Sequence, residues 1–527
     1  MSATLALHPV QRLRVVAVAL VVAASTMVAA SGAIKTVHII VSSTSDSSAA
    51  DAVQRAGGRV ESSLPIANAV VADVPADNVA ALSRIATVAT DRKLVVRSAS
   101  YSGAPGTAAP YEVGATDAWS TSAGRGIGVA LVDTGVAPVP DLLDRVVAVA
   151  DLTPEHRITD SFGHGTFMAG LIAGNGTASN GQYLGIAPES HLVSIKVATA
   201  DGATTLSTVL EGLQIVDQSR ERFNIRVMLL AMSSGSTLSP DSDPLTLALR
   251  KLWHHGIFVV VPAGNDGPGA GSVDSPGLDP TLMTSGAVDD MGTNSVSDDQ
   301  VPSWTSRGPS QFGDAIPEVA APGSHLVSLR APGSTIDQQN PSARVGDMYF
   351  RGSGTSMAAA VTAGVGALIL GANPSLSPDD VKAALIAGAT PLAGADPNAI
   401  GAGVINAVAA GNAATSGDNA NNGLRAHGAG NGNLSFDGRL WDGRVWDGRV
   451  WDGRVWDGRV WDSRVWDGRV WDSRVWDSRV WDSRVWDSRV WDGRLWESRV
   501  WDGRLWESRL WESRLWESRV WDSRLWE

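Results

Sequence analysis

The sequence of 527 residues contains no cysteine. The absence of thiols excludes a disulfide framework, a thiolate metal site and a cysteine nucleophile. Tyrosine and phenylalanine are scarce, with 4 and 7 residues, whereas tryptophan occurs 21 times. The formal net charge is −13 and basic clusters are lacking, so we expect no nucleic-acid partner. The balance of 44% hydrophobic and 18% charged residues is typical of a folded chain of several domains.

The tryptophans are concentrated in a repeat at the C-terminus. Eighteen of them recur every five residues from Trp441 to Trp526, in units of the form Arg-Val/Leu-Trp-Asp/Glu-Gly/Ser. The preceding segment LSFDG resembles a decayed first unit, so the predicted array covers residues 434–527. Each unit carries one arginine and one acid, so the array is neutral and the negative net charge belongs to residues 1–438.

A period of five residues suits neither of the simple secondary structures. On an α-helix successive tryptophans turn by about 140°, and on a flat strand they alternate between the faces. A turn in every unit, supplied by Asp-Gly or Asp-Ser, fits a β-solenoid. A low-complexity tail that becomes ordered on binding fits the composition equally well. Both interpretations stay open, and in either case the array is a candidate for binding a cell surface or wall.

The N-terminus has the features of an export signal. Arg12 and Arg14 precede the apolar run Val15–Ala24, and small residues follow, with Val28–Ala30 resembling a cleavage site. The same stretch is barely long enough for a membrane anchor, and its second half is only weakly hydrophobic. We therefore predict a cleaved signal peptide over residues 1–33 and a secreted, extracellular protein that can associate with the cell surface.

Two folded units are predicted between the signal and the repeat. Residues 34–100 follow the order β-α-β-α-β, with a closing strand over 88–96, which fits a small α+β unit. After a Gly/Pro/Ala-rich start, residues 101–412 alternate short apolar strands with helical stretches, which predicts an α/β fold with a parallel sheet and helices on both faces. Residues 413–433 are rich in asparagine and glycine and are predicted to be a flexible linker.

Four polar residues stand at the ends of predicted elements in the larger unit. Asp133 follows an apolar strand, His164 begins an apolar helix, Asn265 follows another strand, and Ser356 opens a second apolar helix. Singly, each also fits a structural role, such as a turn residue or a helix N-cap. Together they supply a nucleophile, a base, a carboxylate to orient the base and an amide to stabilise an oxyanion. The sequence therefore predicts an acyl-transfer site.

The segments that carry these residues resemble those of subtilases, the subtilisin-like serine peptidases. They read Val-Asp-Thr-Gly at Asp133, His-Gly-Thr at His164, Ala-Gly-Asn at Asn265 and Gly-Thr-Ser-Met at Ser356, in the chain order of that family. The resemblance implies that the aspartate orients the histidine, that the histidine is general base and acid, and that the serine attacks the scissile carbonyl. It also implies an oxyanion hole made by the Asn265 amide and the serine N–H.

The resemblance extends to the substrate cleft. The segments around Gly202 and at Ser233, Ser234 and Gly235 resemble two strands that sandwich an extended peptide by β-augmentation. Asp274 lies in a segment that resembles the base of the primary specificity pocket, which predicts a preference for Lys or Arg before the cut bond. The alternative is that this aspartate is an ordinary surface residue.

A structural metal is suggested by the family but not by a full ligand set. Asp141 matches an acidic calcium ligand, although its partners are not evident and the loop Asn175–Tyr183 departs from the usual calcium loop. We expect no required cofactor and leave structural calcium open. A further departure is Met-Ala-Ala-Ala-Val after Ser356, where the family usually has a proline and a histidine.

The predicted function is a secreted serine endopeptidase made as a zymogen. Residues 34–100 resemble the family's inhibitory propeptide, which implies an intramolecular inhibitor removed by self-cleavage near residues 96–100. Protein and peptide chains are the expected substrates. The alternative is a surface-binding or structural repeat protein whose peptidase acts mainly in its own maturation.

Overall fold

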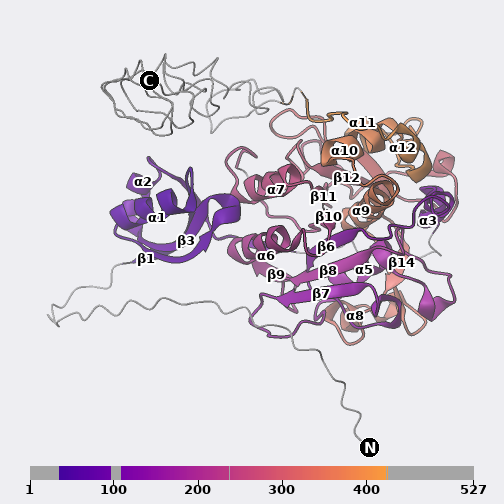
Figure 1. Ribbon diagram of the computed structural model, residues 1–527, viewed down its shortest axis with the longest axis horizontal. Helices are drawn as coiled ribbons and strands as arrows, with labels where there is room; N and C mark the ends of the chain where they lie inside the picture. The colour runs from indigo at the N-terminus through magenta and orange to yellow at the C-terminus, as the bar shows by residue number, and fades with distance from the viewer. Residues whose placement is uncertain (1–34, 96–107, 237, 423, 425–527) are drawn as a thin grey trace, which may run out of the picture.

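The computed structural model describes residues 35–95, 108–236, 238–422 and 424 (Figure 1). The predicted signal peptide, the predicted cleavage region and the predicted repeat array lie outside the described residues. The described residues comprise the two predicted folded units and the first part of the segment that follows them.

The small N-terminal unit is built on a four-stranded antiparallel sheet with the strand order β2-β3-β1-β4. Its elements are β1 (Thr36–Ser42), α1 (Asp46–Arg55), β2 (Arg59–Leu64), η1 (Pro65–Ala67), β3 (Ala69–Pro75), η2 (Ala76–Asn78), α2 (Val79–Leu82), β4 (Thr87–Thr90) and β5 (Lys93–Val95). The α+β class is confirmed, but strand β2 was not predicted, because its exposed polar residues conceal the alternation of a strand. The predicted closing strand over 88–96 is in fact two strands, and only β4 joins this sheet.

A seven-stranded parallel sheet forms the centre of the larger unit, in the order β13-β12-β11-β10-β6-β8-β7. Its strands are β6 (Gly128–Asp133), β7 (Val146–Asp151), β8 (His191–Lys196), β10 (Ile225–Leu229), β11 (Phe258–Pro262), β12 (Met283–Val288) and β13 (Val319–Pro322). Strands β6, β11, β12 and β13 are buried along their whole length, which explains why they appear in the sequence as continuous apolar runs. The predicted α/β fold is confirmed.

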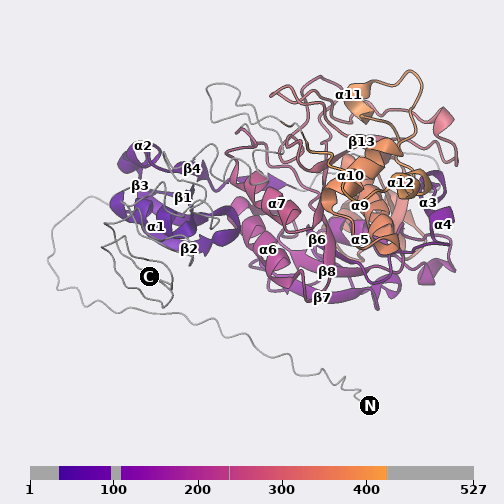
Figure 2. The same cartoon turned by 45° about the horizontal axis from the view of Figure 1, so that its top comes forward.

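Helices cover both faces of this sheet (Figures 1 and 2). Helices α6 and α7 pack together against one face, and α5 and α9 pack together against the other. The longer helices are α5 (His164–Ala173), α6 (Leu206–Ser219), α7 (Pro244–His254), α9 (Thr355–Ala372) and α10 (Pro378–Ala387). The remaining elements are α3 (Ala109–Glu112), α4 (Ala115–Ala118), η3 (Pro140–Leu142), η4 (Thr177–Ser179), β9 (Ala203–Thr205), η5 (Val296–Asp298), β14 (Leu326–Leu329), α8 (Thr335–Gln339), η6 (Pro341–Ala343), β15 (Arg344–Val345), β16 (Tyr349–Gly352), α11 (Pro397–Ile400) and α12 (Ala407–Ala413).

Helix α9 is the central helix of the core. By length and composition it could cross a membrane, but 89% of it is buried inside the protein. Small residues let neighbouring segments approach closely: a Cβ atom added at Gly364 would lie 2.5 Å from Cβ of Ile186. A long apolar helix packed on all sides in this way is a core element, and it holds its first turn, with Ser356, in a fixed position.

The folded unit continues beyond the predicted boundary at residue 412. The backbone N–H of Gly417 donates to Asp380 at 2.8 Å, and the side chain of Asn421 donates to the carbonyl of Thr281 at 3.0 Å. The expectation of a flexible linker from residue 413 is therefore wrong for residues up to 422. The composition conceals this because asparagine and glycine make specific hydrogen bonds as readily as they form linkers.

The small unit docks on α6 and α7 of the larger one (Figure 1). Asp91 accepts hydrogen bonds from the backbone N–H and the hydroxyl of Ser207 at 2.9 and 2.6 Å, at the start of α6. Arg92 donates to both carboxylate oxygens of Asp243, the N-cap of α7, at 2.9 Å. Strand β5 then pairs antiparallel with β9 of the larger unit. The two units thus share hydrogen bonds, a partly buried ion pair and a strand pairing.

Candidate active site

The structure joins Asp133 and His164 in a buried pair. Asp133 ends β6 and His164 begins α5, and their side chains are 0% and 1% exposed. The ring atom Nδ1 lies 2.9 and 3.0 Å from the two carboxylate oxygens. Since a carboxylate only accepts, Nδ1 carries the proton and Nε2 is left as the basic nitrogen. Nε2 is buried and has no hydrogen-bond partner among the described residues.

A second buried carboxylate, Asp160, fixes this pair. It accepts hydrogen bonds from both the backbone N–H and the hydroxyl of Thr166, at 2.8 and 2.6 Å, and from the N–H of Gly163 at 2.7 Å. It also accepts from the hydroxyl of Thr134 at 2.8 Å, and that hydroxyl accepts from Gly165 N–H at 2.9 Å. Burial raises the pKa of Asp160, and these donors oppose the rise. The network ties the neighbours of Asp133 to both sides of His164.

A fully buried lysine holds the segment that follows Asp133. Lys196, at the end of β8, donates to the carbonyl of Thr134 at 3.0 Å and to the hydroxyl of Ser161 at 2.8 Å. It also pairs with Glu155 at 2.9 Å. The sequence analysis identified neither Lys196 nor Asp160; the closeness of Asp160 to the His-Gly-Thr segment was the only available signal, whereas Lys196 looked like an ordinary charged residue.

Ser356 lies in the first turn of α9, and this helix packs against α5, the helix that begins at His164. The N-cap of α9 is Gly354, and no side chain caps the helix, so the structural alternative of a serine cap is wrong. Ser356 lines a small cavity together with Asn265, Ser233 and Asp266. The backbone N–H groups of a helix N-terminus favour negative charge at this position.

The side-chain amide of Asn265 has a defined orientation. Its Oδ1 accepts hydrogen bonds from the backbone N–H and the hydroxyl of Thr355 at 2.9 and 3.0 Å. Because a backbone N–H can only donate, the atom it contacts is the oxygen, and Nδ2 lies at the other end of the amide. Nδ2 is thus available as a donor in the cavity that Ser356 lines, as an oxyanion hole requires.

The predicted cleft residues lie on two segments. Gly202 has a positive φ of 76° and packs against Phe162, where an added Cβ would lie 2.8 Å from a ring carbon. It directly precedes β9, which pairs with β5 of the small unit. The segment from Ser233 to Gly235 is held from the other side, since Ser234 N–H donates to the carbonyl of Ser275 at 2.9 Å.

The carboxylate of Asp274 is occupied by this second segment. It accepts hydrogen bonds from the hydroxyl of Ser233, from Gly235 N–H at 3.3 Å and from Ser275 N–H at 2.7 Å. These contacts give Asp274 a structural role in shaping the cleft, and its role in selecting Lys or Arg stays a prediction. The acid that lines the cavity with Ser356 is Asp266, which the sequence analysis did not single out.

The residues around Asp141 do not fit a metal ion. Its two carboxylate oxygens accept hydrogen bonds from Ala178 N–H and from the hydroxyl of Tyr349, each at 2.7 Å. Burial and the Asp141 carboxylate raise the pKa of Tyr349, so its hydroxyl stays a donor. Both oxygens are thus engaged by protein donors, and we do not assign a cation to Asp141.

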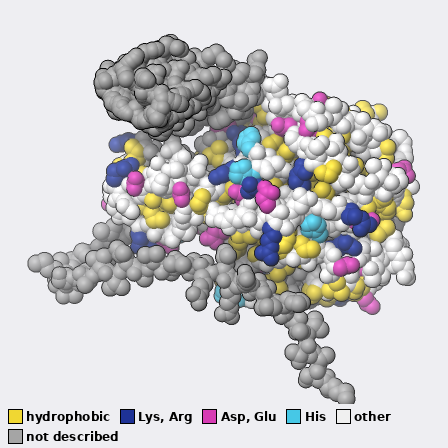
Figure 3. Space-filling model, in the orientation of Figure 1, with side chains coloured by type: hydrophobic (Ala, Val, Ile, Leu, Met, Phe, Trp, Pro, Cys, Tyr) yellow, Lys and Arg dark blue, Asp and Glu magenta, His cyan; other side chains and the backbone are white. Residues whose placement is uncertain are grey.

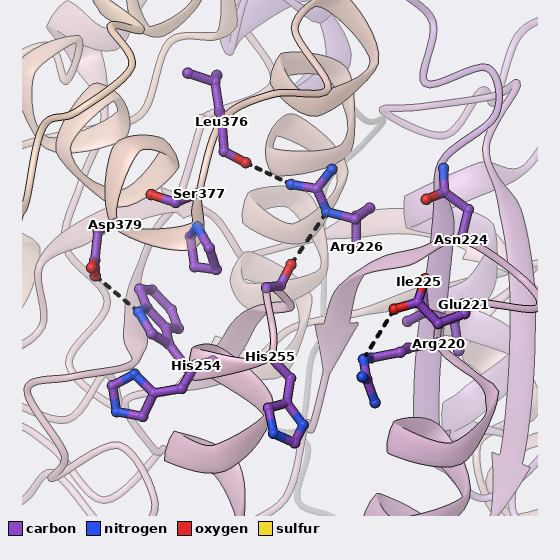
Figure 4. A pocket seen from close by; sticks show the side chains of 13 residues that line it. Arg220, Glu221, Asn224, Ile225, Arg226, His254, His255, Leu376, Ser377 and Asp379 are labelled. Carbon is purple, nitrogen blue, oxygen red and sulfur yellow. Dashed lines mark hydrogen bonds and ion pairs between the residues drawn. The ribbon is translucent and has the colours of Figure 1, made fainter. Parts of the chain in front are cut away.

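A larger cavity of about 370 Å³ lies elsewhere (Figure 4). It is lined by residues just before β10 and β11, at the sheet edge opposite to Asp133 and Asn265. Arg226 donates to the carbonyls of Leu376 and Gly256, and Trp253 donates to Asp379, so these groups are already used in packing. Since active groups gather at the carboxyl ends of parallel strands, we place the chemistry at the smaller cavity.

Comparison with known proteins gives the family. A model described as the Subtilase family matches residues 124–430, which is more than half of the chain and includes all four predicted catalytic and oxyanion-hole residues. Serine protease AprX of Bacillus subtilis (strain 168) is 43% identical over 293 residues, or 54% of this chain and 66% of AprX. Subtilisin of Bacillus sp. (strain TA39) is 32% identical over 279 residues, or 50% of this chain and 61% of that subtilisin. The chain thus spans less than two thirds of either of these relatives.

Subtilisin Savinase of Lederbergia lenta is 32% identical over 288 residues, which cover 91% of its length. Among solved structures, fervidolysin from Fervidobacterium pennivorans has a TM-score of 0.57 at 22% identity, with 75% of this chain and 62% of fervidolysin covered. The fervidolysin match supports the fold. The family model and the Savinase match together show that the chain belongs to the subtilase family of serine peptidases.

Proposed function

We propose that the protein is a serine endopeptidase that hydrolyses peptide bonds through an acyl-enzyme. The observation that carries this proposal is the buried His164–Asp133 pair, whose basic Nε2 has no other partner among the described residues. In this mechanism Nε2 takes the proton from the Ser356 hydroxyl as its oxygen attacks the scissile carbonyl. The imidazolium then protonates the leaving amine, and water repeats the sequence to release the acid.

Charge develops on the carbonyl oxygen of the tetrahedral intermediate. Nδ2 of Asn265 and the backbone N–H of Ser356 would stabilise that oxygen. Thr355 supports this arrangement from behind, because its N–H and hydroxyl hold the amide of Asn265 in one orientation. The Asp133 carboxylate stabilises the imidazolium.

We infer that substrates bind as an added strand. Strand β9 already accepts one antiparallel partner, β5, and Ser233 lines the cavity that Ser356 also lines. Pairing through the backbone does not depend on side chains, so proteins and peptides of many sequences are the proposed substrates. Near the cut bond, Asp266 supplies a negative charge that would favour a basic side chain.

The small unit is proposed to be an inhibitory propeptide. Three contacts support this: its strand β5 occupies the edge of β9, Asp91 caps α6, and Arg92 pairs with the N-cap of α7. A product-like strand at the substrate edge would block the cleft until the chain is cut after β5. Export of the protein and binding of a surface or wall by the repeat are proposed from the sequence alone.

The test compares the full chain with its Ser356→Ala variant. We expect the unchanged chain to shorten itself and to hydrolyse casein, and the variant to do neither. Ser120→Ala, which removes an exposed hydroxyl, is the matched control and should behave like the unchanged chain. Casein hydrolysis by Ser356→Ala would refute the mechanism. Loss of cell-wall binding on deleting residues 434–527 would test the repeat separately.

A further inference from the structure

A buried group of carboxylates lies apart from the catalytic residues. Glu112 comes from α3, and Asp290 and Asp299 come from the loop that follows β12. These side chains are 4%, 1% and 8% exposed. Both oxygens of Glu112, both of Asp299 and Oδ2 of Asp290 are buried and have no hydrogen-bond partner among the described residues. Buried charged oxygens without partners are costly, so the group is incomplete as it stands.

Neighbouring negative charges make the missing partners of this group still more costly. The carboxyls of Glu112 and Asp299 interact directly, and Asp290, Asp289 and Asp298 add to the negative field around them. The imidazole of His325 pairs with Asp289 at 3.1 Å. Two ionised carboxylates cannot hydrogen-bond to each other, so either a proton or a cation must lie between them. Burial raises the pKa of Glu112 and of Asp299, and raises the pKa of Asp290 to about 6.

We propose that Glu112 and Asp299, with Asp290 as an outer member, form a binding site for a divalent cation, with calcium as its occupant. Calcium takes about six to eight oxygen ligands from carboxylates, backbone carbonyls and water. The unpartnered oxygens supply the carboxylate part of such a set. Nothing in the group offers the thiolate or free imidazole ligands that zinc or copper would prefer.

Two other acidic groups do not combine burial with carboxylate oxygens that have no partner. The oxygens of Asp141 are both occupied by protein donors. In the small unit, His38, Glu61 and Asp73 place their ligand atoms within 4.8 Å of one another, but they are largely exposed. Arg59 already pairs with Glu61 at 2.7 Å and with Asp73 at 3.1 Å. Asp73 is therefore a suitable control position.

The loop around the proposed site is connected to the nucleophile. His325 joins it through Asp289 and through its own N–H, which donates to the hydroxyl of Ser353 at 2.8 Å. A second connection runs from Val288, at the end of β12: its carbonyl accepts from Gly323, whose carbonyl accepts from Gly354, each at 2.8 Å. Gly354 is the N-cap of α9, so the cation would stabilise the loop that supports the first turn of the catalytic helix.

The test measures calcium binding to the full chain carrying Ser356→Ala, which prevents self-cleavage. After removal of metals with EDTA, equilibrium dialysis with ⁴⁵Ca²⁺ should show one tight site per chain above the weak background of the other acidic side chains. Substituting one outer-shell partner weakens metal affinity by about 10- to 100-fold, so Glu112→Gln or Asp299→Asn should weaken it by more than about 100-fold. Asp73→Asn, in the small unit, should leave it unchanged.

Thermal unfolding shows whether a variant that binds no calcium is still folded. Without calcium, the double variant Glu112→Gln/Asp299→Asn should melt at or above the parent, because it removes buried repulsion. With calcium, the melting temperature of the parent should rise and that of the double variant should not. The proposal is overturned if the parent binds no calcium at millimolar concentration, which would leave a shared proton as the explanation. It is equally overturned if tight binding survives both single substitutions.

Discussion

The buried carboxylates of the active site and those of the group at Glu112 are satisfied in opposite ways. Asp133 accepts from His164 and from Thr134 N–H, and Asp160 accepts five hydrogen bonds. Glu112 and Asp299 accept none among the described residues. The catalytic carboxylates are therefore completed by the protein itself, whereas the second group requires a partner from outside. Similar residue types thus serve catalysis in one place and ligand binding in the other.

The largest effect should come from changing the carboxylate that orients the base. Asp133→Asn should lower kcat by about 10,000-fold, because an amide can stabilise the wrong tautomer of His164. Turnover of a chromogenic peptide measures this directly. If kcat falls by less than tenfold, the hydrogen bond between Asp133 and His164 is not essential to catalysis, and the proposed role of Asp133 is wrong.

The second-largest effect should come from removing the side-chain donor to the oxyanion. Asn265→Ala should lower kcat by about 100- to 1,000-fold with little change in KM, since the amide acts only on charge formed in the transition state. Steady-state kinetics on the same peptide separate the two constants. A rise in KM at constant kcat would instead assign Asn265 to ground-state binding.

Asp160 and Glu112 are both buried, but only Asp160 accepts hydrogen bonds from the described residues. Asp160→Asn places an amide NH₂ against at least two of the five donors that contact the carboxylate, which should misplace His164 and lower kcat by about 100-fold. The exposed Asp144→Asn should change nothing. A positioning role requires that kcat falls while KM and the cooperativity of unfolding are retained. A variant that merely unfolds earlier, with normal kcat below its melting temperature, would make Asp160 structural only.

The smallest predicted effect concerns the contact between the two units. Arg92→Ala leaves Asp243 buried without its ion-pair partner, and should weaken docking of the small unit by about 2 kcal/mol, because Arg92 itself is partly exposed. The exposed Arg59→Ala should cost less than about 1 kcal/mol. Inhibition of the mature enzyme by added small unit measures both. Equal inhibition by both variants would show that the ion pair does not hold the units together.

The sequence was most informative where function depends on short segments. Asp133, His164, Asn265 and Ser356 each stand in a local pattern at the end of an apolar element, and the structure places all of them at the carboxyl edge of the sheet or at helix starts. The parallel sheet was equally accessible, because strands buried on both faces are continuous apolar runs.

What the sequence did not reveal depends on contacts between distant positions. Glu112 and Asp299 meet only because α3 lies against the loop after β12, and either residue alone looks like a solvated surface acid. The same holds for Arg92 and Asp243, which are 151 positions apart. Strand β5 was assigned to the wrong sheet because its partner, β9, belongs to the other unit. Pairing partners are a tertiary property that local patterns do not contain.

Labelling of the protein by a fluorophosphonate reports whether Ser356 is an activated nucleophile. The reagent traps a serine that an adjacent base has activated, so mass spectrometry should locate one label on Ser356, and Asp133→Asn should abolish it. The account is contradicted if Ser356 stays unlabelled while the protein hydrolyses casein, or if the label is found on another serine.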